Sequence, residues 1–187
     1  MSLIDAILGR RAVRDYTDQA VAETVIAELI EAAVQAPNSM NRQSWSFVVV
    51  TDRRVLARIA REAKAHMFAS VEQSPGPGHV TEHLAAPEFD IFYGAPALVV
   101  ICATAPDEMA TYDCCLAAEN LMLAAHAGGL GSCWIGFAEG WLREPEGKAA
   151  LGLPDQARVV APIILGHPRS RPQSPGRRSP EVRWIRS

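Results

Sequence analysis

The sequence predicts an α+β fold of the α/β sandwich type, in which helices flank a few central strands. Residues 97–103 are almost continuously apolar, which is typical of a strand buried on both faces, and residues 158–166 predict the last strand. Residues 45–51 are rich in β-branched and aromatic side chains and predict a further strand. Elsewhere apolar residues recur at helical spacing, so the intervening segments are expected to be helices.

The first half of the chain divides at glycine and proline. Residues 2–8 alternate in a helical way, and Gly9 is a plausible end for that helix. A second helix of about four turns is expected over 21–34 and ends before Pro37, because the residue before a proline disfavours helical geometry. The remaining expected elements are a helix over 55–66, a helix over 112–126, a strand over 131–137 and a helix over 141–151.

Three longer features shape the expected architecture. The 112–126 helix is apolar nearly all round, so we expect it to be fully buried, with small residues that allow close helix contacts in the core or across a dimer interface. Residues 70–90 carry a run of Pro and Gly and predict a mobile loop or lid. Residues 167–187 form an arginine-rich arm with apolar residues near its end, which points to a dimer. The whole chain, 1–187, is expected to be one domain.

Composition excludes several classes of function. The net charge of −3 gives no general case for nucleic acid or membrane binding. No run approaches the ~20 apolar residues of a membrane helix, and the N-terminus lacks the pattern of a signal peptide. The cysteines lie in apolar segments without a C-x-x-C pair, so we expect reduced core residues of a cytoplasmic protein. They are Cys102, Cys114, Cys115 and Cys133.

Two polar segments flank the 21–34 helix. Arg10, Arg11 and Arg14 bring three guanidinium groups together, and such paired donors suit a phosphate. Residues 37–45 string amide and hydroxyl side chains before a strand, and these suit a heteroaromatic ring or a sugar-alcohol chain. Together the two segments predict a site for one phosphorylated, ring-bearing cofactor.

Other motifs favour plain structural explanations. The glycines of 128–131 follow a helix and open a strand, the reverse of a dinucleotide fingerprint, so a helix C-cap explains them; Gly131 and Gly136 can still let backbone approach a flat ligand. His79 and His83 match H-x-x-E-H, but the prolines around them leave room for only about two turns of helix, so no metal site is expected. No nucleophile has an assignable base. An enzyme with this sequence would rely on its cofactor for chemistry.

The chain resembles the FMN-dependent nitroreductase superfamily over nearly its whole length. The resemblance rests on R-R-x-x-R at 10–14, A-P-N-S-M-N-R-Q-S-W at 36–45, G-A-P at 94–96, A-E-N-L at 118–121, G-L-G-S-C-W-I-G at 129–136, the segment 162–168 and the basic tail. Each motif is short, and their order and spacing make the resemblance specific. It implies an α+β fold with a central mixed sheet flanked by helices, and a homodimer that exchanges C-terminal arms and holds FMN at its interface.

The resemblance also implies roles for individual residues. Arg10, Arg11 and Arg14 would bind the phosphate and ribityl chain, with Ala12 where the family usually has serine. Residues of the polar loop would line the flavin of the other subunit, with Ser44 where the family usually has proline. From that loop, the cofactor-binding residues would be Asn38, Ser39, Asn41 and Gln43. From the end of the 131–137 strand they would be Trp134, Ile135 and Gly136, and from the tail either Arg177 or Arg178.

The implied activity is that of an oxidoreductase. NADH or NADPH would pass a hydride to flavin N5, and a nitroaromatic, quinone or similar acceptor would then enter the same cleft in a ping-pong mechanism. No catalytic side chain and no metal is required, and the 70–90 segment would select the acceptor. Two alternatives remain open: a flavin-binding sensor or carrier without turnover, and a specialised family activity such as reductive dehalogenation or flavin breakdown.

Overall fold

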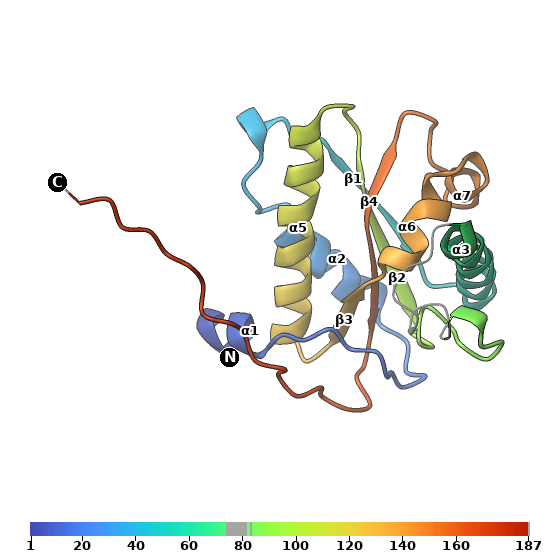
Figure 1. Cartoon of the computed structure of the whole chain (residues 1–187), viewed down its shortest axis with the longest axis horizontal. Helices are drawn as coiled ribbons and strands as arrows, with labels where there is room; N and C mark the ends of the chain where they lie inside the picture. The colour runs from blue at the N-terminus through green and yellow to red at the C-terminus, as the bar shows by residue number, and fades with distance from the viewer. Residues whose placement is uncertain (74–81, 83, 187) are drawn as a thin grey trace.

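The structure, a computed structural model, describes residues 1–73, 82 and 84–186 (Figure 1). These residues form a four-stranded sheet in the order β1-β2-β4-β3. The strands are β1 (Trp45–Val50), β2 (Ala97–Ala103), β3 (Gly131–Trp134) and β4 (Arg158–Gly166). All three strand pairings are antiparallel, so the parallel component of the predicted mixed sheet is confined to one bridge between Ala12 and Ser132. The predicted sandwich of helices around central strands is confirmed.

The central strand β2 divides two apolar cores. Its residues are all fully buried, because β1 and β4 pair with its two edges and helices cover both faces. Alternate side chains point to opposite faces of a strand. Accordingly, Leu98 and Val100 join the core beneath α3 (Arg53–Gln73) and α6 (Gly136–Arg143). Val99 and Ile101 join the core beneath α2 (Glu23–Ala33) and α5 (Glu108–Ala127) (Figure 1).

Two helices cover the second core. In α2 (Glu23–Ala33), Ile26, Leu29 and Ala33 are buried on one face, as the helical spacing predicts. Beside it lies α5 (Glu108–Ala127), which runs nearly the full height of the molecule (Figure 1). The short α1 (Leu3–Gly9) packs near the C-terminal end of α5 and is fixed by a capping box, in which the side chains of Ser2 and Asp5 each accept the other's backbone N–H.

The prediction that the 112–126 helix is fully buried was wrong. One face of α5 is buried, but Met109, Tyr112 and Leu116 are 45–49% exposed, and Cys115 is exposed beside them. The four larger apolar residues of α1 are also exposed: Leu3, Ile4, Ile7 and Leu8. Both helices therefore carry large apolar side chains on their exposed surfaces.

Other boundaries differ from the prediction for local reasons. The helix predicted to end near 66 continues to Gln73 as α3. The strand predicted over 131–137 ends at Trp134, because α6 begins at Gly136. The helix predicted over 141–151 is two helices, α6 and α7 (Pro145–Ala150). They divide at Glu144, whose extended backbone is the conformation that a following proline favours.

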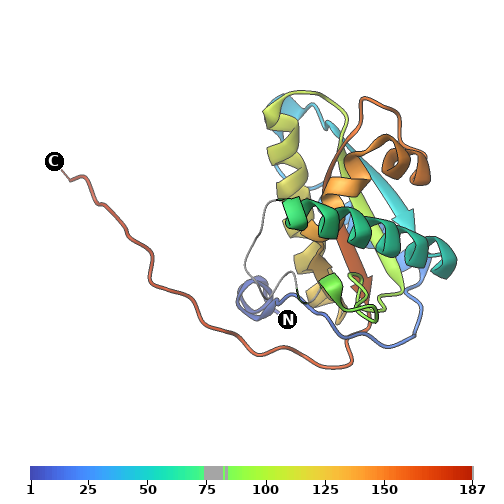
Figure 2. The ribbon, with the colours of Figure 1, turned by 45° about the vertical axis from the view of Figure 1, so that its right-hand side comes forward.

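The structure describes only part of the predicted lid, residues 70–90, but nearly all of the predicted arm, residues 167–187. Of the 70–90 stretch, residues 70–73 belong to α3, Leu84 is buried in the core beneath that helix, and 74–81 and 83 lie outside the described residues. The tail after Gly166 leaves the body of the protein without regular structure, as both ribbon views show (Figures 1 and 2). Its Val182, Trp184 and Ile185 are exposed.

Candidate functional site

The arginine segment is held in an extended conformation along the edge of β3. Ala12 forms a parallel bridge with Ser132, and the Val13 N–H donates to the Ser132 carbonyl at 3.0 Å. The buried Tyr16 hydroxyl donates to the Val13 carbonyl at 2.7 Å. Burial raises the pKa of Tyr16, so this phenol stays a neutral donor at any physiological pH. The segment is therefore fixed before any ligand binds.

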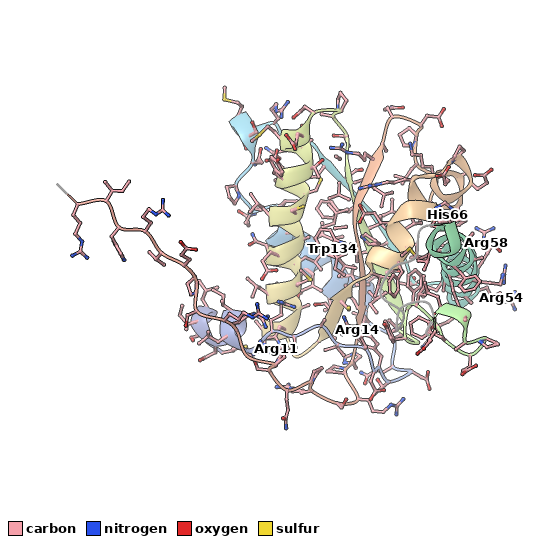
Figure 3. All side chains as sticks on the ribbon, viewed as in Figure 1. Arg11, Arg14, Arg54, Arg58, His66 and Trp134 are labelled. Atoms are coloured by element: carbon pink, nitrogen blue, oxygen red, sulfur yellow. The ribbon has the colours of Figure 1, made fainter. Side chains whose placement is uncertain are left out.

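The extended backbone separates the three arginines into two sets. Side chains alternate along such a segment, so Arg10, Ala12 and Arg14 share one side, while Arg11 and Val13 share the other. The cavities agree. Arg14 lines a cavity of about 670 Å³, whereas Arg11 and Val13 line another of about 240 Å³ (Figure 3). The sequence reasoning treated Arg11 and Arg14 as one cluster, and the structure places them in different cavities.

The cavity beside Arg14 has an aromatic wall. Phe89 and Tyr93 pack edge to face with ring centroids 5.6 Å apart, and the Arg14 guanidinium lies 6.0 Å from the Tyr93 ring centroid. Sequence reasoning missed the two aromatic residues: Phe89 lies in the 70–90 segment that it assigned to an irregular insert, and Tyr93 lies just after that segment.

The Trp134–Gly136 turn connects β3 to α6 and offers backbone donors. The Ile135 N–H is used, since it donates to the Pro162 carbonyl at 2.8 Å. Gly136 is exposed at the first position of α6, where N–H groups have no acceptor within the helix, and no atom lies within 4 Å of the place a Cβ would occupy. Of the three predicted residues in this turn, Gly136 has the N–H that a flat ligand can reach.

Gly131 lets the arginine segment pack against β3; it does not make room for a ligand. A Cβ there would lie 2.8 Å from the Cβ of Val13, so the absence of a side chain lets the arginine segment approach β3. Gly129 has φ of +82° just after α5, in agreement with the predicted C-cap.

The amide loop is strained and firmly tied. Met40, Asn41 and Gln43 have φ of 55°, 53° and 51°. Residues other than glycine rarely adopt this backbone conformation, and it recurs at functional sites. Within the loop, Asn38 Oδ1 accepts the Gln43 N–H at 2.9 Å, and Asn41 Oδ1 accepts from Gln43 Nε2 at 3.3 Å. The predicted residues of this loop do lie together.

Two aspartates of the α5 region hold the amide loop in place. Asp107 accepts two hydrogen bonds from the Arg42 guanidinium, at 2.8 and 3.0 Å, and Asp113 Oδ1 accepts the Ser39 N–H at 3.0 Å. Asp113 is only 2% exposed, and its second oxygen is buried without a partner among the described residues. Neither aspartate was predicted, although an acid inside an apolar helix was a readable signal.

The two polar segments lie at opposite ends of α5. The amide loop contacts Asp113 near the N-terminal end, whereas Gly9 lies against His126 near the C-terminal end. At about 1.5 Å per residue, the helix separates these contacts by about 20 Å. Arg10 reaches part of the way and forms an ion pair with Glu119 at 3.7 Å. Within one chain, the arginines and the amides do not meet.

The two tail arginines predicted to bind the cofactor, Arg177 and Arg178, are not brought to either polar segment. Arg177 and Arg178 are exposed, and the Arg177 guanidinium donates to the carbonyl of Gly176. Within the described tail, the Arg169 side chain contacts the body of the protein through an ion pair with Asp15 at 3.3 Å and a hydrogen bond to the Tyr16 carbonyl.

Metal and thiol chemistry find little support in the described residues. No group of three or more His, Cys, Asp or Glu side chains among them is placed to hold a metal ion, and His79 and His83 lie outside them. Cys102, Cys114 and Cys133 are buried as predicted, while Cys115 is exposed, contrary to prediction. Burial raises the pKa of Cys102 and of Cys114 to about 12, which leaves both thiols poor nucleophiles. No helix in the described part of the chain is long and apolar enough to cross a membrane.

Comparison with known proteins identifies the family. A model described as the nitroreductase family matches residues 7–167. The chain belongs to the nitroreductase family. Its match covers the four strands and every helix described above apart from the first four residues of α1, and it leaves residues 1–6 and the tail from residue 168 outside.

Individual relatives of this nitroreductase-family chain share its length and fold. It is 32% identical to the NADH dehydrogenase of Thermus thermophilus, over 87% of this chain and 85% of that protein. It is 29% identical to the nitrobenzene nitroreductase of Ectopseudomonas oleovorans, over 87% and 85% of the two chains. Among solved structures, a nitroreductase with bound FMN from Bacteroides fragilis is similar over the whole of both chains, with a TM-score of 0.85 and 25% identity.

Proposed function

We propose that this member of the nitroreductase family is an FMN-dependent oxidoreductase. The observation that carries the proposal is the fixed arginine segment along β3, which presents Arg14 to the aromatic cavity, together with the exposed Gly136 that begins α6. Two cations suit an anionic phosphate, and the Gly136 N–H suits a ring nitrogen. The donor set therefore fits FMN, the cofactor in the similar Bacteroides fragilis structure.

The protein's own residues would bind and orient the cofactor. Arg10 and Arg14 would hold the phosphate and the polar chain, and Ala12 supplies no hydroxyl to that side. Trp134 and Ile135 would lie along the ring face, and the Gly136 N–H would be available to donate to a ring nitrogen. One of Arg177 and Arg178 would close over the phosphate. Bound FMN supplies the redox chemistry, since it accepts a hydride from NADH or NADPH and returns two electrons to an acceptor.

A homodimer would bring the two polar segments together. Since α5 holds them about 20 Å apart in one chain, Asn38, Ser39, Asn41 and Gln43 would line the flavin held by the arginines of the other chain. The exposed apolar residues of α1, α5 and the tail supply a surface for this pairing. The four free cysteines suit a reducing compartment such as the cytoplasm.

The cavity of about 670 Å³ beside Arg14 would admit the nicotinamide and then the acceptor. Its aromatic wall of Phe89 and Tyr93 suits flat rings, so nitroaromatic and quinone acceptors are the expected class. Alternate occupation of one cavity by donor and acceptor gives ping-pong kinetics.

The visible spectrum of the purified protein tests the proposal. We expect a yellow protein with one FMN per chain, which NADH or NADPH bleaches without oxygen and a nitroaromatic or quinone restores. A colourless protein that takes up no FMN would contradict cofactor binding. A yellow protein that neither nicotinamide bleaches would instead indicate a flavin-binding sensor or carrier.

Two substitutions test the assigned residues. Arg10→Ala and Arg14→Ala should each release FMN, whereas Arg54→Ala, on the far side of the molecule, should retain it (Figure 3). Full retention of flavin by both site variants would refute the phosphate assignment.

A further inference from the structure

We propose that the cavity lined by Arg11 binds a small oxyanion, such as inorganic phosphate, at a site separate from the flavin. This cavity has a volume of about 240 Å³ and lies where α1, the C-terminal end of α5 and the first residues of the tail come together. A water molecule takes about 30 Å³ of liquid volume, so the space holds a tetrahedral anion with several waters. We call it the Arg11 cavity.

The guanidinium of Arg11 has an unused donor. Its Nη1 donates to the carbonyl of Arg10 at 2.6 Å, but its Nε is buried without an acceptor among the described residues. A buried donor that lacks an acceptor carries a desolvation penalty, and a charged donor carries a larger one. An oxyanion in the cavity that Arg11 lines would offset the charge of its guanidinium.

A second arginine and a histidine complete the wall. Arg171 enters from the tail, and His126 from the last turn of α5. Burial lowers the pKa of His126, and Arg171, Arg10 and Arg11 lower it further. The imidazole thus senses a positive potential, the condition that attracts an anion.

Acidic side chains do not cancel this potential. Asp5 is the one carboxylate among the described residues of the lining, and it already accepts the backbone N–H of Ser2 in the cap of α1. Neither Arg11 nor Arg171 has a carboxylate within 4.0 Å among the described residues, whereas Arg10 pairs with Glu119. The lining therefore carries two permanent positive charges, of Arg11 and Arg171, and one negative charge, of Asp5.

Close packing makes the Arg11 cavity part of the fold. A Cβ on Gly9 would lie 2.9 Å from His126 Nε2, so the end of α1 rests directly on the imidazole. The backbone alternation that directs Arg11 into this cavity directs Arg10 and Arg14 away from it. The oxyanion site and the proposed flavin site thus lie on opposite sides of one extended segment.

Titration of FMN-loaded protein with inorganic phosphate tests the inference. We expect a saturable rise in the melting temperature and measurable heat of binding, with chloride at matched ionic strength as the reference. Arg11→Gln and Arg171→Gln should each weaken phosphate binding by about tenfold or more, because each removes a charge-assisted hydrogen bond. Arg183→Gln, in the same tail, and Arg54→Gln, on α3, should leave it unchanged.

Three results would overturn the inference. They are a phosphate response equal to that of chloride, an unchanged phosphate affinity in Arg171→Gln, or phosphate binding that FMN competitively removes. The last result would place the cavity within the flavin site. Arg171 is exposed, so its variant keeps the test decisive even if Arg11→Gln fails to fold. If the protein binds no FMN, the same titration on apo-protein reads the oxyanion site independently.

Discussion

Asp113 accepts the backbone N–H of Ser39 through one carboxylate oxygen while the rest of its side chain is buried in α5. This bond fixes the amide loop to a helix of the core, beside a loop backbone with three positive φ values. Pre-organised loops bind ligands more tightly, because less ordering remains to be done on binding.

Replacement of Asp113 should separate its two effects. Asp113→Asn keeps an acceptor for Ser39, so FMN affinity should stay close to that of the wild type. Asp113→Ala removes the acceptor and should destabilise the protein by about 1–3 kcal/mol and weaken FMN binding. Urea unfolding and FMN fluorescence titration measure the two quantities, and Glu28→Ala on the exposed part of α2 serves as control. Equal FMN affinity in the Asn and Ala variants would exclude a role in loop positioning.

Ala12→Ser should tighten FMN binding. Ala12 lies on the same side as Arg10 and Arg14, where family members usually have a serine, so a hydroxyl there adds a donor toward the phosphate. A net gain of about 0.5–1.5 kcal/mol corresponds to about a two- to tenfold lower dissociation constant. Titration of apo-protein measures it, with Ala27→Ser on exposed α2 as control. An unchanged or weaker affinity would argue against this orientation of the segment.

Gly131→Ala should displace the arginine segment. The new Cβ would meet Val13 at 2.8 Å, and overpacking of this kind costs about 1–3 kcal/mol. Both the unfolding free energy and the FMN affinity should fall. Gly128→Ala is the matched control, since the added Cβ would lie no closer than 3.4 Å to another atom, the Ala124 carbonyl oxygen, and the φ of Gly128 is −79°. A variant with unchanged FMN affinity would show that the segment tolerates the shift.

Acid should loosen the tie between Arg42 and Asp107. The hydrogen bond from Arg42 lowers the pKa of Asp107 from 3.8 to about 2. Because the folded-state pKa is the lower one, this contribution is fully present above pH 4 and is lost as the pH falls toward 2. Asp107→Asn should therefore flatten the stability profile between pH 4 and 2, and high salt should weaken the effect. Asp155→Asn is the control, and identical profiles for both variants would contradict the assignment.

A charge on the exposed face of α5 should disrupt the proposed dimer. Leu116 is 45% exposed between Tyr112 and Glu119, so Leu116→Lys places an ammonium in the expected interface. Sedimentation should show a shift to monomer, with parallel loss of FMN because each site needs two chains. Ala65→Lys on α3 introduces the same charge elsewhere. A monomeric variant that retains FMN would show that one chain suffices.

Much of the fold was predictable because burial leaves a direct pattern. The β2 and β4 strands were predicted with their observed bounds, since both are central and apolar throughout. The exposed face of α5 was not predictable from composition, because its apolar residues have the same character as those of the buried face. The break at Glu144 was readable from Pro145, and was missed because the apolar spacing continued across it.

The candidate site was predictable as residue types, but less so as geometry. The two polar segments were recognised, whereas the divergence of Arg11 from Arg14 depends on the extended backbone that the Ser132 bridge imposes. Asp107 and Asp113 act on the amide loop from more than sixty residues away in sequence, a pairing that local patterns do not encode.

The length of α5 has a genetic consequence. If the arginines of one chain and the amides of the other complete each site, a chain defective in Arg10 and a chain defective in Asn38 fail separately for different reasons. Mixed in one dimer, they assemble one site from two intact halves and a second site from two damaged halves. Co-expression of two inactive alleles should then restore up to half of the flavin content per mixed dimer, a form of complementation that a site contained within one chain does not allow.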